Sequence, residues 1–359
     1  MLTRRTMRNH KMRRSFALHT AAVLSDLLEG IQPETVTGAI LFLAPDLDCQ
    51  AVTAALDNLF PYIGCTVHST YSHDLNNKKQ NQTASMLLFI GDNKHKTGLI
   101  EAFAPGTGVF AFSLDDDNIE QYMQRYPMLG GVASENYASD QPAIWTNHQF
   151  LTSGTVAMCL PPHPVSLQVG KGWSVVDKQS YKVTRASGNK LFELNGQPVR
   201  SVYEQYIEVE QLIPSYPLML ESTGQTVAAI RYQQAPDGEC LVMSRPIAVD
   251  ENVRFSAASR TEILHETHDA ALRSYVENER YLRSFGLCIS CTSRAWLLSD
   301  MEPMEFNYIQ KFSGEPGSDN ILVYLNGEFE PTPTGTRHHN HSAVLAAFYS
   351  VDCDLISEI

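Results

Sequence analysis

The C-terminal part of the chain sets polar side chains directly between apolar runs that need to be buried. An apolar run at 321–325 leads into the sequence Asn-Gly-Glu-Phe at 326–329, and His-His-Asn-His-Ser at 338–342 precedes a second apolar run at 343–348. The first run has the length of a strand. We expect the second run to be a helix that Asn340 caps, because a short polar side chain accepts hydrogen bonds from the first backbone amides of a helix. The region therefore predicts a mixed α and β core with a polar cluster beside it.

Length and composition limit the classes of protein to which the chain can belong. The 359 residues, 43% of them hydrophobic, exceed one ordinary domain and suggest two, each with its own core. A formal net charge of -13 repels phosphate backbones, so we expect no nucleic-acid partner. No run of eighteen apolar residues occurs, so we expect no membrane span. The seven cysteines are an odd number scattered along the chain, which predicts free thiols in a reducing compartment rather than a disulfide framework.

The N-terminus departs from the acidic balance of the chain, because six basic side chains fall within the first fourteen residues. A secretory signal would continue with an apolar stretch, whereas residues 15–31 repeat apolar side chains at helical spacing with acidic ones on the other face. We therefore expect a basic arm over 1–14, a core helix over 15–31 and a cytoplasmic protein. A solvated terminus is the simplest interpretation of the arm, although basic residues can also contact anionic lipid or an acidic partner.

Mixed helical and strand-like patterns predict an α+β fold. In the first half we expect strands at 38–44, 63–67, 84–91 and 109–112, a helix at 48–60, and a hairpin at 144–160 that turns at 152–154. Prolines between 161 and 164 interrupt both helix and strand and predict a domain link, which gives domains at 15–163 and 164–359. The second domain is rich in strands, with helices expected at 201–210 and 261–285.

The familiar catalytic and nucleotide-binding sequences are absent. The chain has no Gly-x-Gly-x-x-Gly, no Gly-x-x-x-x-Gly-Lys-Ser/Thr and no Gly-x-Ser-x-Gly. His265 and His268 lie three residues apart, where a zinc protease helix has four with a glutamate between them. Cys288 and Cys291 have the spacing of a zinc or redox pair, but they point to opposite faces of an expected strand and no second pair completes a metal site. We expect both to be buried.

Several spaced pieces of the sequence resemble the FIST family of intracellular sensory modules. Those similar to its C-terminal domain are 172–173, 182–186, 191–198 with Tyr203, 289–294 with Glu305, and the tail at 321–342; those similar to its N-terminal domain are 42–45, 63–66 and 130–133. The resemblance implies two mixed-sheet domains, FIST N and FIST C, packed against each other. After the Gly-Cys-Thr at 64–66 the family usually continues with Ala-Gly-Glu, whereas this chain continues with Val67, His68 and Ser69 and lacks the glutamate.

The resemblance also implies a stand-alone sensor of a small molecule such as an amino acid. Arginine binds carboxylates and glutamate pairs with ammonium groups, so Arg294 and Glu328 are candidates for the two ends of such a ligand. Asn340 and Cys291 stand in the same family pattern and complete the candidate ligand site. Buried structural ion pairs are the alternative for such groups, and we favour that role for Arg185 and Glu305.

One branch of the family consists of haem-binding nitric-oxide sensors that act on partner histidine kinases, so the resemblance implies haem b as a cofactor. Neutral imidazole is a good iron ligand. The candidate ligands are, in order, His341, His339, His68 and His268, and His341 with His339 forms the candidate metal pair. The absence of Cys-x-x-Cys-His means that any haem is held without a covalent bond.

Three hypotheses thus remain open. The first is a haem-bound nitric-oxide sensor that regulates a histidine kinase or another signalling protein. The second is a haem-free sensor of an amino acid or similar metabolite. The third is an enzyme that uses Cys291, His339 or Glu305, which lacks the support of any catalytic sequence pattern. A homodimer is compatible with all three.

Overall fold

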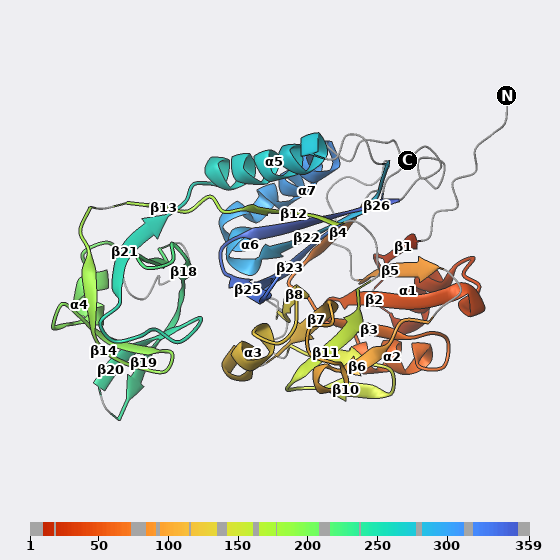
Figure 1. The fold of residues 1–359 in the computed structure, drawn as a ribbon, viewed down its shortest axis with the longest axis horizontal. Coiled ribbons are helices and arrows are strands. Elements are labelled where there is room, and N and C mark those ends of the chain that lie inside the picture. Colours follow the sequence, from red (N-terminus) through yellow and green to blue (C-terminus); the bar gives the residue numbers. More distant parts are fainter. Residues whose placement is uncertain are drawn as a thin grey trace.

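The chain forms a mixed α/β body with a strand-rich lobe at one end (Figure 1). The structure is a computed structural model that describes residues 10–17, 19–72, 84–90, 94–114, 116–134, 142–160, 165–176, 178–207, 216–236, 238–277, 282–311 and 319–350. The first nine residues of the basic arm and the proline link at 161–164 lie outside these ranges. No helix in the described ranges combines the length and the apolar character that a membrane crossing needs.

The body contains three mixed sheets. The first has the order β1 (His10–Ser15), β5 (Ala84–Ile90), β2 (Val36–Leu43), β3 (Tyr62–Thr66), β9 (Ile144–Thr146) and β10 (Gln149–Leu151). The second has the order β25 (Gly335–His339), β24 (Glu328–Thr332), β8 (Met128–Val132), β7 (Val109–Ser113), β11 (Thr155–Cys159) and β6 (Thr97–Leu99). The third has the order β12 (Val165–Gly170), β26 (Ala343–Ser350), β22 (Leu282–Cys291), β23 (Asp319–Leu325) and β4 (Thr70–Ser72).

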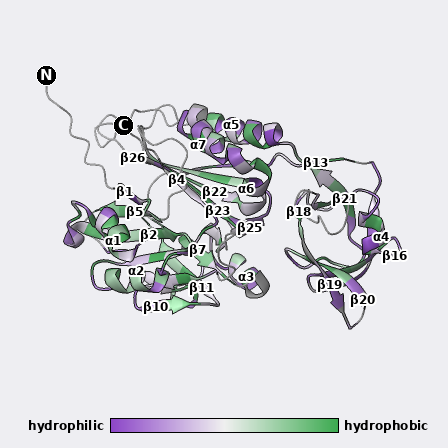
Figure 2. Cartoon of the chain, turned by 180° about the vertical axis from the view of Figure 1, so that it is seen from behind, coloured by the Kyte–Doolittle hydropathy of each residue, from purple (hydrophilic) through white to green (hydrophobic). Residues whose placement is uncertain are grey.

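One apolar core lies where the three body sheets meet. Phe42 of β2, Phe112 of β7 and Phe348 of β26 are fully buried in it, although they come from opposite ends of the chain. Helices cover the outer faces of the sheets: α1 (Thr20–Leu28) and α2 (Cys49–Leu56) on the first, α3 (Asp116–Met123) on the second, and α5 (Arg260–Glu277), α6 (Thr292–Leu298) and α7 (Glu302–Lys311) on the third. Figure 2 shows the body strands as mainly hydrophobic, whereas α5 alternates between hydrophobic and hydrophilic residues.

Segments from the two halves of the chain share two of these sheets. Strand β4 pairs antiparallel with β23, so that Tyr71 lies opposite Leu322. Strand β24 pairs with β8, where Glu328 lies opposite Gly131. The domain limits predicted at 163 and 164 stay a prediction, but the C-terminal strands are hydrogen-bonded into the N-terminal part and do not form a separate body.

The lobe comprises residues 174–257 and has its own apolar core. Its strands are β13 (Ser174–Val175), β14 (Tyr181–Ser187), β15 (Lys190–Leu194), β16 (Gln197–Pro198), β17 (Leu218–Leu220), β18 (Thr226–Val227), β19 (Ala229–Ala235), β20 (Gly238–Met243) and β21 (Asn252–Ala257), with the short helix α4 (Val199–Tyr203). Two segments, 171–173 and 258–259, join the lobe to the body and are called the neck below. Figure 1 shows the lobe to the left of the body, beyond the start of α5.

Several predicted elements differ from the structure. The prediction of a helix at 343–348 is wrong, because this apolar run is the inner strand β26, which pairs with both β12 and β22. A run that is apolar throughout has no periodicity that separates a buried strand from a buried helix. Asn340 therefore caps no helix.

Three element boundaries also differ from those predicted. Helix α1 begins at Thr20 rather than at residue 15, because the end of the basic arm forms β1 and pairs with β5. Helix α5 ends at Glu277, and the residues from Leu282 onward form β22 instead of extending the helix. Within the predicted hairpin, β9 and β10 pair with each other while β11 pairs with β7 and β6 in another sheet.

The parallel pairing of β7 with β8 depends on a glycine. Gly130 has a φ of +153°, and an added Cβ would lie 1.8 Å from the carbonyl oxygen of Ala111. We expect Gly130→Ala to lower the free energy of unfolding by about 3 kcal/mol or more, measured by urea denaturation, because backbone must move. Gly106→Ala is the control: its φ is +84° with no atom within 4 Å, so it should cost only about 1 kcal/mol. Equal effects of the two substitutions would contradict this account.

Candidate functional site

A fully buried ion pair lies beside the neck. Arg294 of α6 donates to Glu305 of α7 with 2.6 Å between Nη2 and Oε1, and neither side chain is exposed to solvent. Thr267 of α5 donates to the same carboxylate oxygen at 2.6 Å, and Tyr324 of β23 donates to Oε2 at 2.6 Å. Burial alone would raise the pKa of Glu305, but the Arg294 charge and these hydrogen bonds outweigh it and lower that pKa.

The Arg294 guanidinium also fixes the neck to the body. Its Nη1 donates to the backbone carbonyl of Lys171, and Nη2 donates to the carbonyl of Ile263 at 3.2 Å. Its Nε donates to the Ser290 hydroxyl at 3.1 Å. All three guanidinium nitrogens are therefore engaged by the protein. The structure places this predicted ligand-binding residue inside the packing of the helices and not on a cavity wall.

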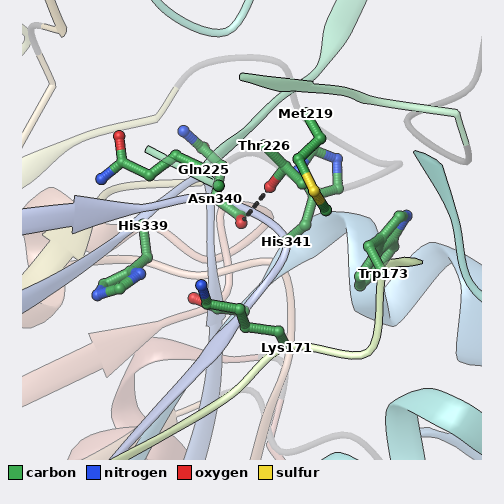
Figure 3. Close-up of a pocket in the computed structure, with 10 residues that line it drawn as sticks. Lys171, Trp173, Met219, Gln225, Thr226, His339, Asn340 and His341 are labelled. Carbon is green, nitrogen blue, oxygen red and sulfur yellow. Dashed lines mark hydrogen bonds between the residues drawn. The ribbon is translucent and has the colours of Figure 1, made fainter. Parts of the chain in front are cut away.

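A small polar cavity lies at the junction of neck, lobe and body. Its walls come from the neck, the β17–β18 hairpin of the lobe and the turn that joins β25 to β26; the lining residues are Lys171, Trp173, Met219, Gly224, Gln225, Thr226, His339, Asn340, His341 and Ser342 (Figure 3). Its volume is about 20 Å³, enough for roughly one water molecule. A wider open pocket of about 530 Å³ shares Lys171 and Trp173 with the cavity.

The lobe closes over the cavity through two hydrogen bonds. The Thr226 hydroxyl donates to the backbone carbonyl of Asn340 at 2.8 Å, and Gln225 Nε2 donates to the carbonyl of His338 at 3.3 Å. Figure 3 shows Thr226 facing the Asn340 carbonyl across the cavity. Both acceptors belong to the polar turn that the sequence singled out, so the position of the lobe is tied to that turn.

The turn brings His339, Asn340 and His341 onto one wall. His341 has a left-handed backbone with a φ of +61°, and its ring packs edge-on against Trp173 of the neck with 5.0 Å between ring centroids. His339 Nε2 lies 2.8 Å from Oε2 of Glu330 on β24. This hydrogen bond is the main reason why the pKa of Glu330 is lowered. His339 is therefore already occupied by a carboxylate.

Glu328 and Cys291 lie directly behind the Ser342 side of the cavity. The Ser342 hydroxyl donates to Glu328 Oε2 at 2.7 Å, and the carboxyl group is fully buried. Burial raises the pKa of Glu328 well above its usual range. Burial and the Glu328 charge raise the pKa of the Cys291 thiol to about 12, so the thiol is protonated near neutral pH and is a poor nucleophile. Cys291 gives no support to the enzyme hypothesis.

The other two predicted iron ligands lie elsewhere. His68 packs against Trp296 with 6.4 Å between ring centroids, and its backbone amide donates to the carbonyl of Tyr324. His268 on α5 lies 3.1 Å from Asp269 Oδ1. Neither of these two histidines lines the junction cavity.

The residues at the junction do not fit a haem as they are placed. His339 bonds to Glu330, and the cavity beside His341 has room for about one water molecule rather than for a macrocycle. Within the described ranges, no three histidine, cysteine, aspartate or glutamate side chains come together as a metal site. The predicted metal pair His339 and His341 thus lacks a third protein ligand among these residues.

Buried polar atoms without a hydrogen-bond partner collect at this junction. Among the residues described, they include Trp173 Nε1, Arg245 Nε, Glu328 Oε1, His338 Nε2 and Asn340 Nδ2. Native proteins leave few such atoms, and a cluster of them calls for an explanation. Sequence patterns could not have identified Gln225, Thr226 or Arg245, because they lie on lobe segments without a distinctive sequence and reach the cavity only through the fold.

Comparison with known proteins supports the family resemblance in part. Residues 37–197 match the family model described as the FIST N domain. FIST domains form a family of sensor domains in signal transduction. The matched segment begins in β2 and ends in β16 of the lobe, so it includes the first neck segment with Trp173. No curated protein matches the chain.

A second buried carboxyl group makes stability depend on pH. Glu302 Oε2 accepts hydrogen bonds from Ser69 at 2.8 Å and Tyr71 at 3.0 Å, and burial raises its pKa from 4.5 to about 7. The folded state therefore binds a proton that the unfolded state releases between these pH values. We expect this contribution to the free energy of unfolding to fall as pH rises from about 4.5 to about 7. In denaturant titrations Glu302→Gln should remove this slope; an unchanged slope would contradict the assignment.

Removing one partner of the buried ion pair between Arg294 and Glu305 should strongly destabilise the folded protein. Glu305→Gln leaves the Arg294 guanidinium buried without a counter-charge, and we expect a loss of about 3 to 5 kcal/mol in the free energy of unfolding. Arg294→Met combined with Glu305→Leu removes both charges and should be closer to the wild type than Glu305→Gln. Glu204→Gln, which removes the exposed ion pair with Arg200, should change stability little. A double variant that loses as much stability as Glu305→Gln, or more, would contradict a coupled pair.

Proposed function

We propose, on the premise that the chain carries a FIST N domain, that the protein is a sensor that binds a small polar metabolite at the junction of lobe and body. The observation that carries this proposal is the cluster of unpartnered buried polar atoms at the junction among the described residues. Asn340 is the central member, because the residue is only 9% exposed and it lines the cavity. A ligand at this place would give these atoms the partners that the protein does not.

Unpartnered polar atoms provide a driving force for binding. Each buried donor or acceptor without a partner costs about 1 to 3 kcal/mol. A ligand acceptor on Asn340 Nδ2 or Trp173 Nε1 recovers part of that cost, and a ligand donor near Glu328 Oε1 does the same. Ammonium and carboxylate groups on one small molecule meet both needs, which favours an amino acid or a similar metabolite.

Binding of a metabolite at the junction would also change the position of the lobe relative to the body. The cavity holds about one water molecule, so a metabolite enters only if the β17–β18 hairpin moves relative to the β25–β26 turn. The hydrogen bonds of Thr226 and Gln225 to that turn are then rearranged. A ligand that binds one lobe position more tightly than another shifts the balance between them. A signalling partner such as a histidine kinase, or a second copy of the chain, would recognise the favoured position.

The same geometry gives less support to the haem hypothesis. Haem would need the His339 bond to Glu330 broken and a cavity many times larger than the one at His341. A small metabolite needs only a modest opening between two hairpins. We therefore favour the haem-free sensor over the haem-bound nitric-oxide sensor.

A metabolite screen tests the proposed function. We expect at least one amino acid or small organic acid to raise the unfolding temperature of the purified protein, and Asn340→Ala to weaken that ligand about tenfold or more, because a buried hydrogen bond is lost. Asn252→Ala, at an exposed position of β21, should bind as the wild type does.

The same preparation should be mixed with haem and examined by absorption spectroscopy. A sharp Soret band at one haem per chain that shifts with nitric oxide, together with no metabolite hit, would contradict the proposal and restore the haem hypothesis. If the protein stays colourless and Asn340→Ala does not change the affinity for its metabolite, the binding site lies elsewhere than at the junction.

A further inference from the structure

Arg245 of the lobe, which follows β20, is a half-buried cation at the junction that forms no ion pair with a described carboxylate, although Glu120 and Glu251 act on it from farther away. Its Nη1 donates to Gln225 Oε1 at 2.6 Å, and Gln225 in turn lines the cavity. Its Nε is buried and has no hydrogen-bond partner among the described residues. No carboxylate in those ranges forms an ion pair with it. Burial lowers the pKa of Arg245, although the charges of Glu120 and Glu251 act in the opposite direction.

The neighbouring groups do not offset this charge. Gln225 is a neutral amide. Burial and the Arg245 charge lower the pKa of His338 to about 3, so this imidazole is neutral at physiological pH. Lys171 adds a second cationic side chain to the cavity wall. Burial raises the pKa of Glu328, which disfavours a negative charge on that carboxyl group. The junction thus holds two cationic side chains, Arg245 and Lys171, while the carboxylate of Glu330 is already bonded to His339 and Arg337.

We infer that the junction recognises the anionic group of its ligand, a carboxylate or a phosphate, and that Arg245 is the residue that selects for it. This inference rests on the proposed function and adds the charge of the ligand to it. In the ligand-free protein the Gln225 amide oxygen occupies one guanidinium nitrogen. An oxyanion reaching past Gln225 accepts from Nε and supplies the missing negative charge, and Asn340 Nδ2 and Lys171 provide further donors on the other walls.

Two physical properties make arginine suitable for this selection. Hydrogen bonds between a guanidinium and an oxyanion are shorter and about twice as strong as those between neutral groups. A half-buried cation also penalises an uncharged ligand, which would leave the positive charge uncompensated. The lobe residues that line the cavity, Met219, Gly224, Gln225 and Thr226, are uncharged. Discrimination between an acid and its amide by the lobe therefore comes from Arg245, which lies behind Gln225.

The test titrates the full-length protein with matched probes. Malonate, glutamate and inorganic phosphate are the anions, and malonamide is the uncharged analogue of malonate; binding is measured by calorimetry and by the shift in unfolding temperature. The variants are Arg245→Met, which removes the charge at similar length, and Arg245→Lys, which keeps the charge but not the planar group. Arg254→Met is the control, because that lobe arginine is paired with Glu221.

We expect at least one anion to bind the wild type and Arg254→Met, with malonamide binding more weakly than malonate. Arg245→Met should weaken the anion by about ten- to a hundredfold, and Arg245→Lys should weaken it less. Carboxylate binding without phosphate binding, or the reverse, identifies the source of the anion. Without ligand, Arg245→Met should unfold at the same or a higher temperature, because an uncompensated buried charge has been removed.

Several outcomes would overturn the inference about Arg245. If no probe anion binds the wild type, or if Arg245→Met binds anions as the wild type does, Arg245 selects nothing. If Arg245→Met lowers the unfolding temperature of the ligand-free protein and leaves relative affinities unchanged, its role is structural. An uncharged metabolite that binds in an Asn340-dependent way would overturn the inference and leave the proposed function standing. Failure of the whole metabolite screen would instead count against the proposed function.

Discussion

The buried ion pair between Arg294 and Glu305 is the interaction on which the arrangement of body, neck and lobe depends. It joins α6 to α7, takes Thr267 from α5 and Tyr324 from β23, and holds the carbonyl of Lys171 in the neck. A charge pair without solvent is stabilising only when the remaining hydrogen-bonding positions are filled, and here they are. Since the neck carbonyl is one of those positions, the same pair fixes the point from which the lobe leaves the body.

This arrangement separates a rigid part of the molecule from one that can be displaced. The body strands of both chain halves share one core and two sheets, and the β25–β26 turn is joined at each end to a strand of a body sheet. The lobe has a core of its own, and its β17–β18 hairpin meets the turn through the hydrogen bonds of Thr226 and Gln225. Such polar contacts cost less to exchange for ligand contacts than apolar packing does. The proposed sensing role depends on that difference.

The sequence predicted the parts of the fold that have a clear pattern. Strands near 84–90 and 109–113 were expected from their apolar runs and are present, and the FIST resemblance is supported by the match at residues 37–197. The run at 343–348 was assigned to a helix because a strand buried on both faces loses its alternation. The polar turn was singled out correctly as a feature, and it lies on the cavity wall, but its role in binding stays a prediction. No sequence pattern pointed to Arg245 or Thr226, because their importance comes from interactions between segments about a hundred residues apart.

The central claim is that a ligand binds where lobe and body meet. Amide hydrogen exchange tests it most directly, measured on the full-length protein with and without the metabolite that raises its unfolding temperature most, because exchange reports local opening at each segment. The account predicts that residues 218–227 of the lobe and 338–342 of the body gain protection together, and that Asn340→Ala abolishes the change at both. Protection at only one of these segments, at neither, or equally in Asn340→Ala would contradict it.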